Sequence, residues 1–161
     1  MKKLTLIRHA KSSWNNPIND FKRPIIEEGI QKTIKVATET KNLFNDKSLI
    51  WVSSAERTKQ TAKLFLSIWD ENSEMQIQFK DDLYTFDLNQ FEKIVKSCPN
   101  VYKNLILFGH NSAITDFVNK FGDIFIDNVP TSGYVSIIFE GDDWNKINKG
   151  KTDKIIFPRD I

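Results

Sequence analysis

The sequence is poor in the residues that form covalent or metal cross-links. Among its 161 residues are one cysteine, Cys98, and two histidines, His9 and His110. A single cysteine excludes an internal disulfide, and without neighbouring thiols it cannot anchor a zinc site. Because Cys98 lies on an apolar stripe with helical spacing, we expect it to be a small core residue.

Long apolar runs are also absent. The hydrophobic stretch behind the N-terminal lysines is interrupted at Arg8, which makes it too short for a signal peptide or a membrane span. The composition, 40% hydrophobic and 27% charged, is typical of a soluble globular protein. We therefore expect a cytoplasmic protein without a membrane partner, folded as a single domain over residues 1–161.

The charges and the glycines argue against two further classes of function. Lys and Arg number 23 and Asp and Glu number 21, and the basic residues form no long block, so we expect no nucleic-acid partner. The glycine patterns G-x-G-x-x-G and G-x-x-x-x-G-K-[ST] do not occur, and neither does the G-x-S-x-G of serine hydrolases. Nucleotide binding and serine-hydrolase chemistry are therefore unsupported.

Short runs rich in Leu, Ile and Val alternate with amphipathic segments. Strands are predicted over 3–9, 48–54, 75–79, 104–110, 134–141 and 154–157, the last at a sheet edge. Helices are predicted over 27–45, 55–69, 91–98 and 114–121, and the stripe of the first comprises Ile30, Ile34, Ala37 and Phe44. This alternation predicts an α/β fold, a three-layer α/β/α sandwich with a mostly parallel central sheet.

Charged and imidazole side chains stand where three of these strands end. Arg8 and His9 close the first strand, Arg57 opens the helix after the second, and His110 follows the run at 104–109. Ligands bind outside the carboxyl ends of parallel strands, where the loops converge. Two guanidinium groups, two imidazoles and a helix N-terminus describe a receptor for a compact dianion such as phosphate.

The same four residues disfavour a metal site. Taken singly, a histidine at a strand end is more often structural than functional, and only the set of four indicates a site. Cationic neighbours without matched carboxylates would repel a divalent ion, so we expect neither a metal nor another cofactor.

Three motifs occur in a familiar order: "LIRHAKSSW" at 6–14, "SSAERTKQTA" at 53–62 and "LFGHNSAITDF" at 107–117. Together with "DFKRPIIEEG" at 20–29 and "PTSG" at 130–133, they resemble the histidine phosphatase superfamily, the phosphoglycerate mutase-like group. Within it the sequence is most similar to the SixA-type phosphohistidine phosphatases. The resemblance spans nearly the whole chain and implies a phosphoglycerate mutase-like fold.

The resemblance assigns a role to each residue of the motifs. His9 matches the nucleophile, Arg8 and Arg57 match the arginines that clamp phosphate, and His110 matches the second histidine that supports the transferring phosphoryl group. It implies a metal-independent phosphatase that forms a phosphohistidine intermediate.

The irregular stretch from residue 12 to residue 24 supplies the remaining candidates. By resemblance, Ser12 and Asn15 are further phosphate contacts, and Arg23 is structural. Trp14 fits either the rim of the pocket or the core. A loop of this length inside a compact domain is more often functional than idle.

The sequence departs from many phosphatases of the superfamily in its general acid. The segment where an acid would lie offers Asp81, Asp82 and Asp87, none of which clearly matches, and Asp87 is equally suited to cap a helix. A missing acid matters for a phosphate ester, whose alkoxide leaves poorly, and much less for phosphohistidine.

The sequence therefore predicts a phosphatase, and its absent acid favours phosphohistidine on a protein partner as the substrate. No segment between the predicted elements is long enough for a lid, and an open pocket suits a side chain on a protein surface. Two alternatives stay open. One is a phosphomonoesterase acting on a small or peptide phosphate ester, and the other is a non-catalytic module that binds phosphorylated partners.

Overall fold

A mixed sheet forms the centre of the computed structural model, which describes residues 1–14, 19–70 and 77–161. Within these residues the sheet has six strands in the order β3-β2-β4-β1-β5-β6. They are β1 (Lys2–Arg8), β2 (Leu49–Ser53), β3 (Ile77–Lys80), β4 (Asn104–Gly109), β5 (Tyr134–Phe139) and β6 (Lys151–Ile156). The first four strands are parallel, whereas β5 is antiparallel to both β1 and β6, which confirms the mostly parallel sheet.

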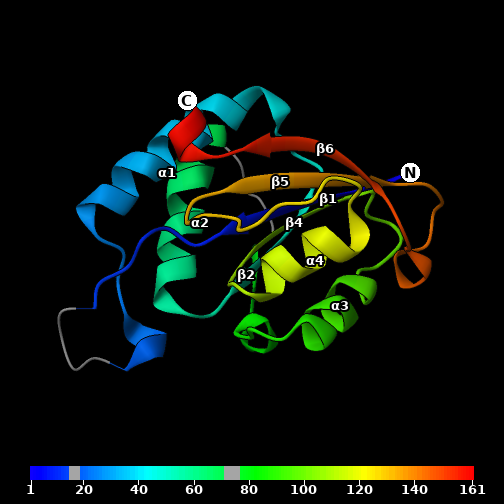
Figure 1. The fold of residues 1–161 in the computed structure, drawn as a ribbon, viewed down its shortest axis with the longest axis horizontal. Coiled ribbons are helices and arrows are strands. Elements are labelled where there is room, and N and C mark those ends of the chain that lie inside the picture. The colour runs from blue at the N-terminus through cyan, green and yellow to red at the C-terminus, as the bar shows by residue number, and fades with distance from the viewer. Residues whose placement is uncertain (15–18, 71–76) are drawn as a thin grey trace.

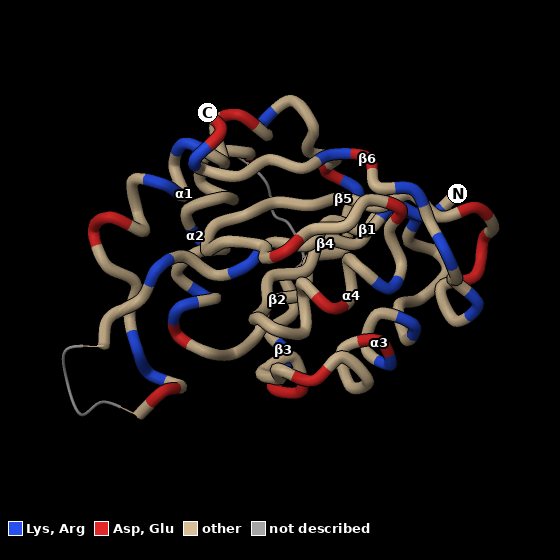
Figure 2. The backbone as a smooth tube through the Cα atoms, in the orientation of Figure 1, with Lys and Arg blue, Asp and Glu red and all other residues tan. Residues whose placement is uncertain are grey.

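Helices cover both faces of this sheet (Figure 1). One face packs against α1 (Glu27–Thr40) and α2 (Glu56–Trp69), and the other packs against α3 (Leu88–Lys96) and α4 (Ala113–Phe121). The predicted three-layer sandwich is therefore confirmed. Across the described ranges, every helix is too short or too polar to traverse a bilayer. Acidic and basic residues are interspersed along the backbone (Figure 2).

The first helix differs from its prediction in both length and orientation. It ends at Thr40 rather than residue 45 and tightens into a 3-10 turn, η2 (Lys41–Leu43). Ala37 of the predicted stripe is fully buried, but the stripe is wrong at Ile34, which is 37% exposed. Threonines replace it on the buried face, where Thr33 bonds to Ser132 and Thr40 accepts from the Trp69 indole N–H. The buried residues of α1 are Gly29, Thr33, Val36, Ala37 and Thr40.

The other elements differ from prediction mainly at their boundaries. The edge strand β6 begins at Lys151, three residues before the predicted range of 154–157. The predicted strand over 75–79 is observed from Ile77, and residues 75 and 76 lie outside the described part. Cys98 is buried in the core, as predicted.

Gly29 lets α1 approach the loop that follows β1. A Cβ atom at this position would lie 2.6 Å from the carbonyl oxygen of Lys11. That carbonyl also accepts the backbone N–H of Ile26, just before the helix, at 3.0 Å. Helix and loop are therefore in direct backbone contact two residues beyond the predicted nucleophile His9.

We expect Gly29→Ala to destabilise the protein, although alanine is normally the better helix former. The added methyl group must displace the Lys11 backbone, which costs about 1–3 kcal/mol of unfolding free energy. Urea unfolding measures the change, with Glu39→Ala on the exposed face of α1 as the control, for which we expect a change within about 0.5 kcal/mol. Stabilisation by Gly29→Ala would show that the close approach is relaxed in solution.

Candidate active site

The sheet brings the four predicted residues to one edge. Arg8 is the last residue of β1 and lies in register with Gly109 of the neighbouring parallel strand β4. His9 and His110 therefore follow two adjacent strands, and their ring centroids are 5.3 Å apart. Arg57 joins them from the first turn of α2.

Backbone hydrogen bonds hold the end of β1 in place. The His9 N–H donates to the Gly109 carbonyl, and the Arg8 N–H donates to the Gly133 carbonyl, both at 3.1 Å. On the same side, the N–H of Ser132 lies 3.1 Å from the carbonyl oxygens of both Arg8 and His9. Ser132 has a φ of 62°, a left-handed conformation that costs free energy in a residue other than glycine. The hydrogen bonds of the Ser132 N–H, together with the bond between its hydroxyl and that of Thr33, compensate for this cost.

The hydrogen bond of His9 fixes which of its ring nitrogens is reactive. Nδ1 lies 2.7 Å from the carbonyl oxygen of Ala10, and because a carbonyl can only accept, Nδ1 must carry the proton. In the neutral ring this leaves the lone pair on Nε2. The Ala10 N–H is itself bonded to Thr61 of α2 at 2.9 Å, so the loop after β1 is fixed on both sides. His9 therefore presents Nε2 as a nucleophile.

Both imidazoles are held neutral. Burial, with smaller effects of the charges of Arg57, Arg8 and Arg23, lowers the pKa of His9 to about 4 against the opposing effect of the Ala10 carbonyl. Burial, together with His9 and Arg57, lowers the pKa of His110 to about 2. A neutral His9 is required for attack on phosphorus.

His110 is oriented by a hydroxyl from the neighbouring strand. Its Nε2 lies 2.8 Å from Ser53 Oγ at the end of β2, and its side chain is almost fully buried. Ser53 Oγ also accepts the Ala55 N–H at 3.4 Å. The contact with Ser53 occupies Nε2 and leaves Nδ1 as the ring nitrogen without a partner in the protein.

The two arginines are anchored at one end of each guanidinium. Arg8 Nη1 donates to the Val129 carbonyl at 2.9 Å. Arg57 is 1% exposed and donates to Asp20 twice, from Nη1 to its carbonyl at 2.7 Å and from Nη2 to its carboxylate at 3.1 Å. The Nε atom of each guanidinium has no hydrogen-bond partner in the protein.

Unpartnered polar atoms concentrate at this site. Within the described residues, four buried side-chain nitrogen or oxygen atoms have no hydrogen-bond partner in the protein. Three of these four atoms are Arg8 Nε, Arg57 Nε and His110 Nδ1. Buried polar groups without partners are costly and rare in folded proteins. Two guanidinium N–H donors and one imidazole nitrogen thus remain available to a bound anion.

Asp20 is the site residue that sequence reasoning missed. Its carboxylate receives hydrogen bonds from Arg57, from Arg23 Nε at 3.0 Å and from the Tyr84 hydroxyl. Burial alone would raise the pKa of Asp20, but these bonds together with the charge of Arg57 lower it to about 2. The "DFKRP" segment was part of the resemblance, yet nothing in its pattern singled out the aspartate.

The other residues predicted from the segment after β1 have different outcomes. Ser12 is buried and its Oγ accepts from Arg23 Nη1, so its role as a phosphate contact stays a prediction. Asn15 lies outside the described residues. Trp14 is 77% exposed, with its ring 3.6 Å from the Arg23 guanidinium, so it is not a core residue. Arg23 bonds to Ser12 and Asp20, which is consistent with the expected structural role.

The three aspartates considered as a general acid differ in their surroundings. Asp87 accepts the Gln90 N–H at 3.0 Å and is the N-cap of α3, as one of the two readings had it. Asp81 and Asp82 are exposed in the 3-10 turn η3 (Asp81–Leu83). In residues 1–14, 19–70 and 77–161, no group of three His, Cys, Asp or Glu side chains is placed to hold a metal ion.

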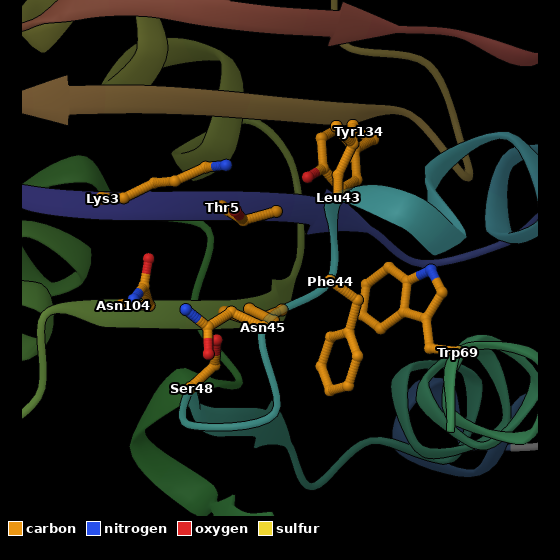
Figure 3. A pocket seen from close by; sticks show the side chains of 10 residues that line it. Lys3, Thr5, Leu43, Phe44, Asn45, Ser48, Trp69, Asn104 and Tyr134 are labelled. Atoms are coloured by element: carbon orange, nitrogen blue, oxygen red, sulfur yellow. The ribbon is translucent and has the colours of Figure 1, made fainter. Parts of the chain in front are cut away.

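A separate cavity of about 110 Å³ lies far from this edge (Figure 3). Lys3 and Asn104, which line it, stand at the amino ends of β1 and β4, whereas Arg8 and His110 stand at the carboxyl ends. Trp69 and Phe44 form one of its walls. This cavity therefore shares no residue with the candidate active site.

Comparison with known proteins identifies the family. The family model described as "Histidine phosphatase superfamily (branch 1)" matches residues 4–119, which include Arg8, His9, Arg57 and His110. The chain belongs to the histidine phosphatase superfamily.

A curated plant protein is similar to this chain over part of its length. An uncharacterized chloroplastic protein of Arabidopsis thaliana is 29% identical over 119 residues, which are 68% of this chain and 54% of that protein. The chain thus spans about half the length of the curated relative it matches.

Two solved structures show how widely the fold is shared. The protein histidine phosphatase SixA, complexed with tungstate, has a TM-score of 0.80 at 16% identity, covering 98% of both chains. A putative alpha-ribazole-5'-P phosphatase from Escherichia coli has a TM-score of 0.70 at 15% identity, also covering 98% of both chains. The fold is therefore common to phosphatases with different substrates and does not itself select one.

We expect the two histidines to titrate far below the ordinary pKa of about 6.5. In a proton NMR titration of the tag-free protein, the His9 ring should have a midpoint near pH 4, and the His110 ring should remain neutral to about pH 2. Assignment is direct because the chain has two histidines and His110→Gln removes one resonance. A His9 midpoint of 6 or above would mean that the ring is solvated in solution.

The same shifts predict how stability depends on pH. The folded protein disfavours protonated His9, so the unfolded chain binds more protons below its ordinary pKa, and stability falls as pH drops from about 6.5 toward 4. Each neutral histidine contributes a slope of about 1.4 kcal/mol per pH unit in that window. Urea unfolding at pH 7, 6 and 5 should therefore show a shallower pH dependence for His9→Gln than for the native protein.

Proposed function

We propose that this protein is a metal-independent phosphatase that removes the phosphoryl group from phosphohistidine on a protein partner. The observation that carries the proposal is the group of three unpartnered nitrogens, Arg8 Nε, Arg57 Nε and His110 Nδ1, next to the lone pair of His9. We infer that His110 binds phosphate with its proton on Nδ1, so that all three nitrogens donate. A phosphoryl group offers three oxygens to such donors. It also presents a phosphorus atom to the nucleophile.

In the first step, His9 Nε2 attacks phosphorus in line with the leaving group. A bond forms between Nε2 and phosphorus, the bond from phosphorus to the substrate nitrogen breaks, and its electron pair goes to that nitrogen. The substrate ring enters protonated on its other nitrogen and therefore leaves as neutral imidazole. Arg8 and Arg57 stabilise the negative charge on the equatorial oxygens in the transition state. The positive charges of Arg8 and Arg57, which help to keep His9 neutral, therefore also favour the transfer.

In the second step, water attacks the phosphorus atom bound to His9. The bond from phosphorus to Nε2 breaks, the electron pair returns to the His9 ring, and inorganic phosphate leaves after the water has lost a proton. The hydrogen bond from Nδ1 to the Ala10 carbonyl keeps the ring in the same tautomer and orientation throughout. Splitting the reaction in this way replaces one difficult step with two easier ones.

The carboxylates near the pocket favour a nitrogen-linked substrate over an ester. With a pKa of about 2, Asp20 is ionised at neutral pH and cannot donate a proton to a leaving group. The Tyr84 hydroxyl donates a hydrogen bond to the Asp20 carboxylate, and burial and that bond raise the pKa of the hydroxyl. A departing imidazole needs far less help from an acid than an alkoxide does.

Similarity to SixA adds independent support. That structure is described as a protein histidine phosphatase complexed with tungstate, a tetrahedral oxyanion that resembles phosphate. The match covers nearly all of both chains, and neither has a substantial insertion relative to the other. We infer that the pocket stays open enough to receive a side chain from a protein surface.

The proposal is tested by phosphate release from a phosphohistidine-bearing protein in the presence of a chelator. We expect His9→Ala to lower the rate by about 10³-fold or more, because it removes the nucleophile. Glu39→Ala on the exposed face of α1 is the control and should keep the native rate. Binding of phosphorylated protein without turnover would instead support the binding module, and a preference for phosphoserine would support the phosphomonoesterase.

A second test concerns Asp20. If Asp20 acts by holding Arg57, Asp20→Asn should lower kcat/KM by the same factor, about 10- to 100-fold, for phosphoramidate and for phosphoserine. If Asp20 were the acid, phosphoserine turnover would fall much further than phosphoramidate turnover. Parallel assays on the two substrates therefore separate positioning from proton donation.

A further inference from the structure

An aromatic side chain that the catalytic steps do not use lies against the pocket. Phe86 is 50% exposed, yet its ring is 5.5 Å from that of His110 and 5.6 Å from that of Tyr84, edge to face in both cases. Singly exposed phenylalanines are normal on protein surfaces. Phe86 differs because its buried half contacts two residues of the site, which puts its exposed half at the mouth.

The backbone around Phe86 is fixed on both sides. Before it, the Tyr84 N–H donates to the Asp81 carbonyl at 3.1 Å and Leu83 is fully buried. After it, the Asp87 N–H donates to Thr85 Oγ1 at 3.2 Å, and the Asp87 carboxylate caps α3. The ring is therefore positioned before any ligand arrives.

In-line attack determines which part of a substrate meets this ring. The proposed nucleophile His9 is 8% exposed, and in-line attack puts the leaving group on the side of phosphorus opposite His9 Nε2, so we infer that the leaving group points toward solvent. His110, which bonds the phosphoryl group in the proposed mechanism, is the residue that Phe86 contacts. The leaving group thus departs from a phosphoryl group held one ring away from Phe86.

We propose that Phe86 is a specificity-determining residue that packs against the leaving imidazole of phosphohistidine. This inference rests on the proposed function. In phosphohistidine the bond from nitrogen to phosphorus lies in the plane of the imidazole, so a phosphoryl group held by Arg8, Arg57 and His110 brings a flat ring to the mouth. Aromatic rings attract one another in edge-to-face and offset geometries, whereas the methylene of phosphoserine has no such face.

The test compares two substrates that share the bond from nitrogen to phosphorus but differ in the ring. The ratio of kcat/KM for a phosphohistidine peptide to kcat/KM for phosphoramidate measures what the imidazole contributes. Phe86→Ala should lower this ratio about three- to tenfold, and Phe86→Tyr, which keeps the ring, should preserve it. Any shift of His110 that impairs the chemistry affects both substrates and cancels in the ratio.

The matched control is Phe79→Ala. Phe79 is 55% exposed on β3, with the Lys59 ammonium 5.4 Å from its ring, and its loss should leave the ratio unchanged. An unchanged ratio in Phe86→Ala overturns the inference. So does a variant that loses activity on p-nitrophenyl phosphate and none on the phosphohistidine peptide, because the ring would then serve an aryl ester.

Failure of the proposed function gives a different result. If the native protein released no phosphate from the phosphohistidine peptide or from phosphoramidate, both the proposed function and this inference would be lost. If the native protein hydrolyses both and only the Phe86 ratio is unchanged, the phosphatase stands and the aromatic contact does not.

Discussion

Two guanidinium groups, that of Arg57 buried and that of Arg8 partly buried, determine most of what surrounds them. A buried charge is tolerated only when it is hydrogen-bonded, and Arg8 and Arg57 obtain part of what they need from the Val129 carbonyl and from Asp20. The rest of each fork has no partner in the protein. An anion is the ligand that completes this arrangement.

The histidines follow from the same constraint. Burial beside cations makes a charged imidazole unfavourable, so His9 and His110 are neutral without any dedicated base. The hydrogen bonds to Ala10 and Ser53 then decide which nitrogen of each ring faces the ligand. In the proposed mechanism, binding and reactivity thus depend on one electrostatic arrangement, because the phosphoryl group that satisfies the arginines is also the electrophile.

The sequence was informative wherever a local pattern determines a position in space. The carboxyl ends of adjacent parallel strands must meet, so Arg8, His9 and His110 could be placed together from strand patterns, and the motifs added their roles by resemblance. Asp20 and Tyr84 could not be placed, because they lie 64 residues apart in irregular segments without a period. The buried face of α1 was predicted only in part, because Thr33 and Thr40 are buried through hydroxyl hydrogen bonds that no hydropathy pattern contains.

The central position of β1 also has a consequence for the order in which the chain acquires its site. The strand that ends at Arg8 is synthesised before β4 and β5, with which it pairs, and Arg8 bonds to Val129 and Gly133. The chain as far as Gly133 must therefore leave the ribosome before the end of β1 can be held in place. Until then the nascent chain carries Arg8 and His9 without the partners that orient them.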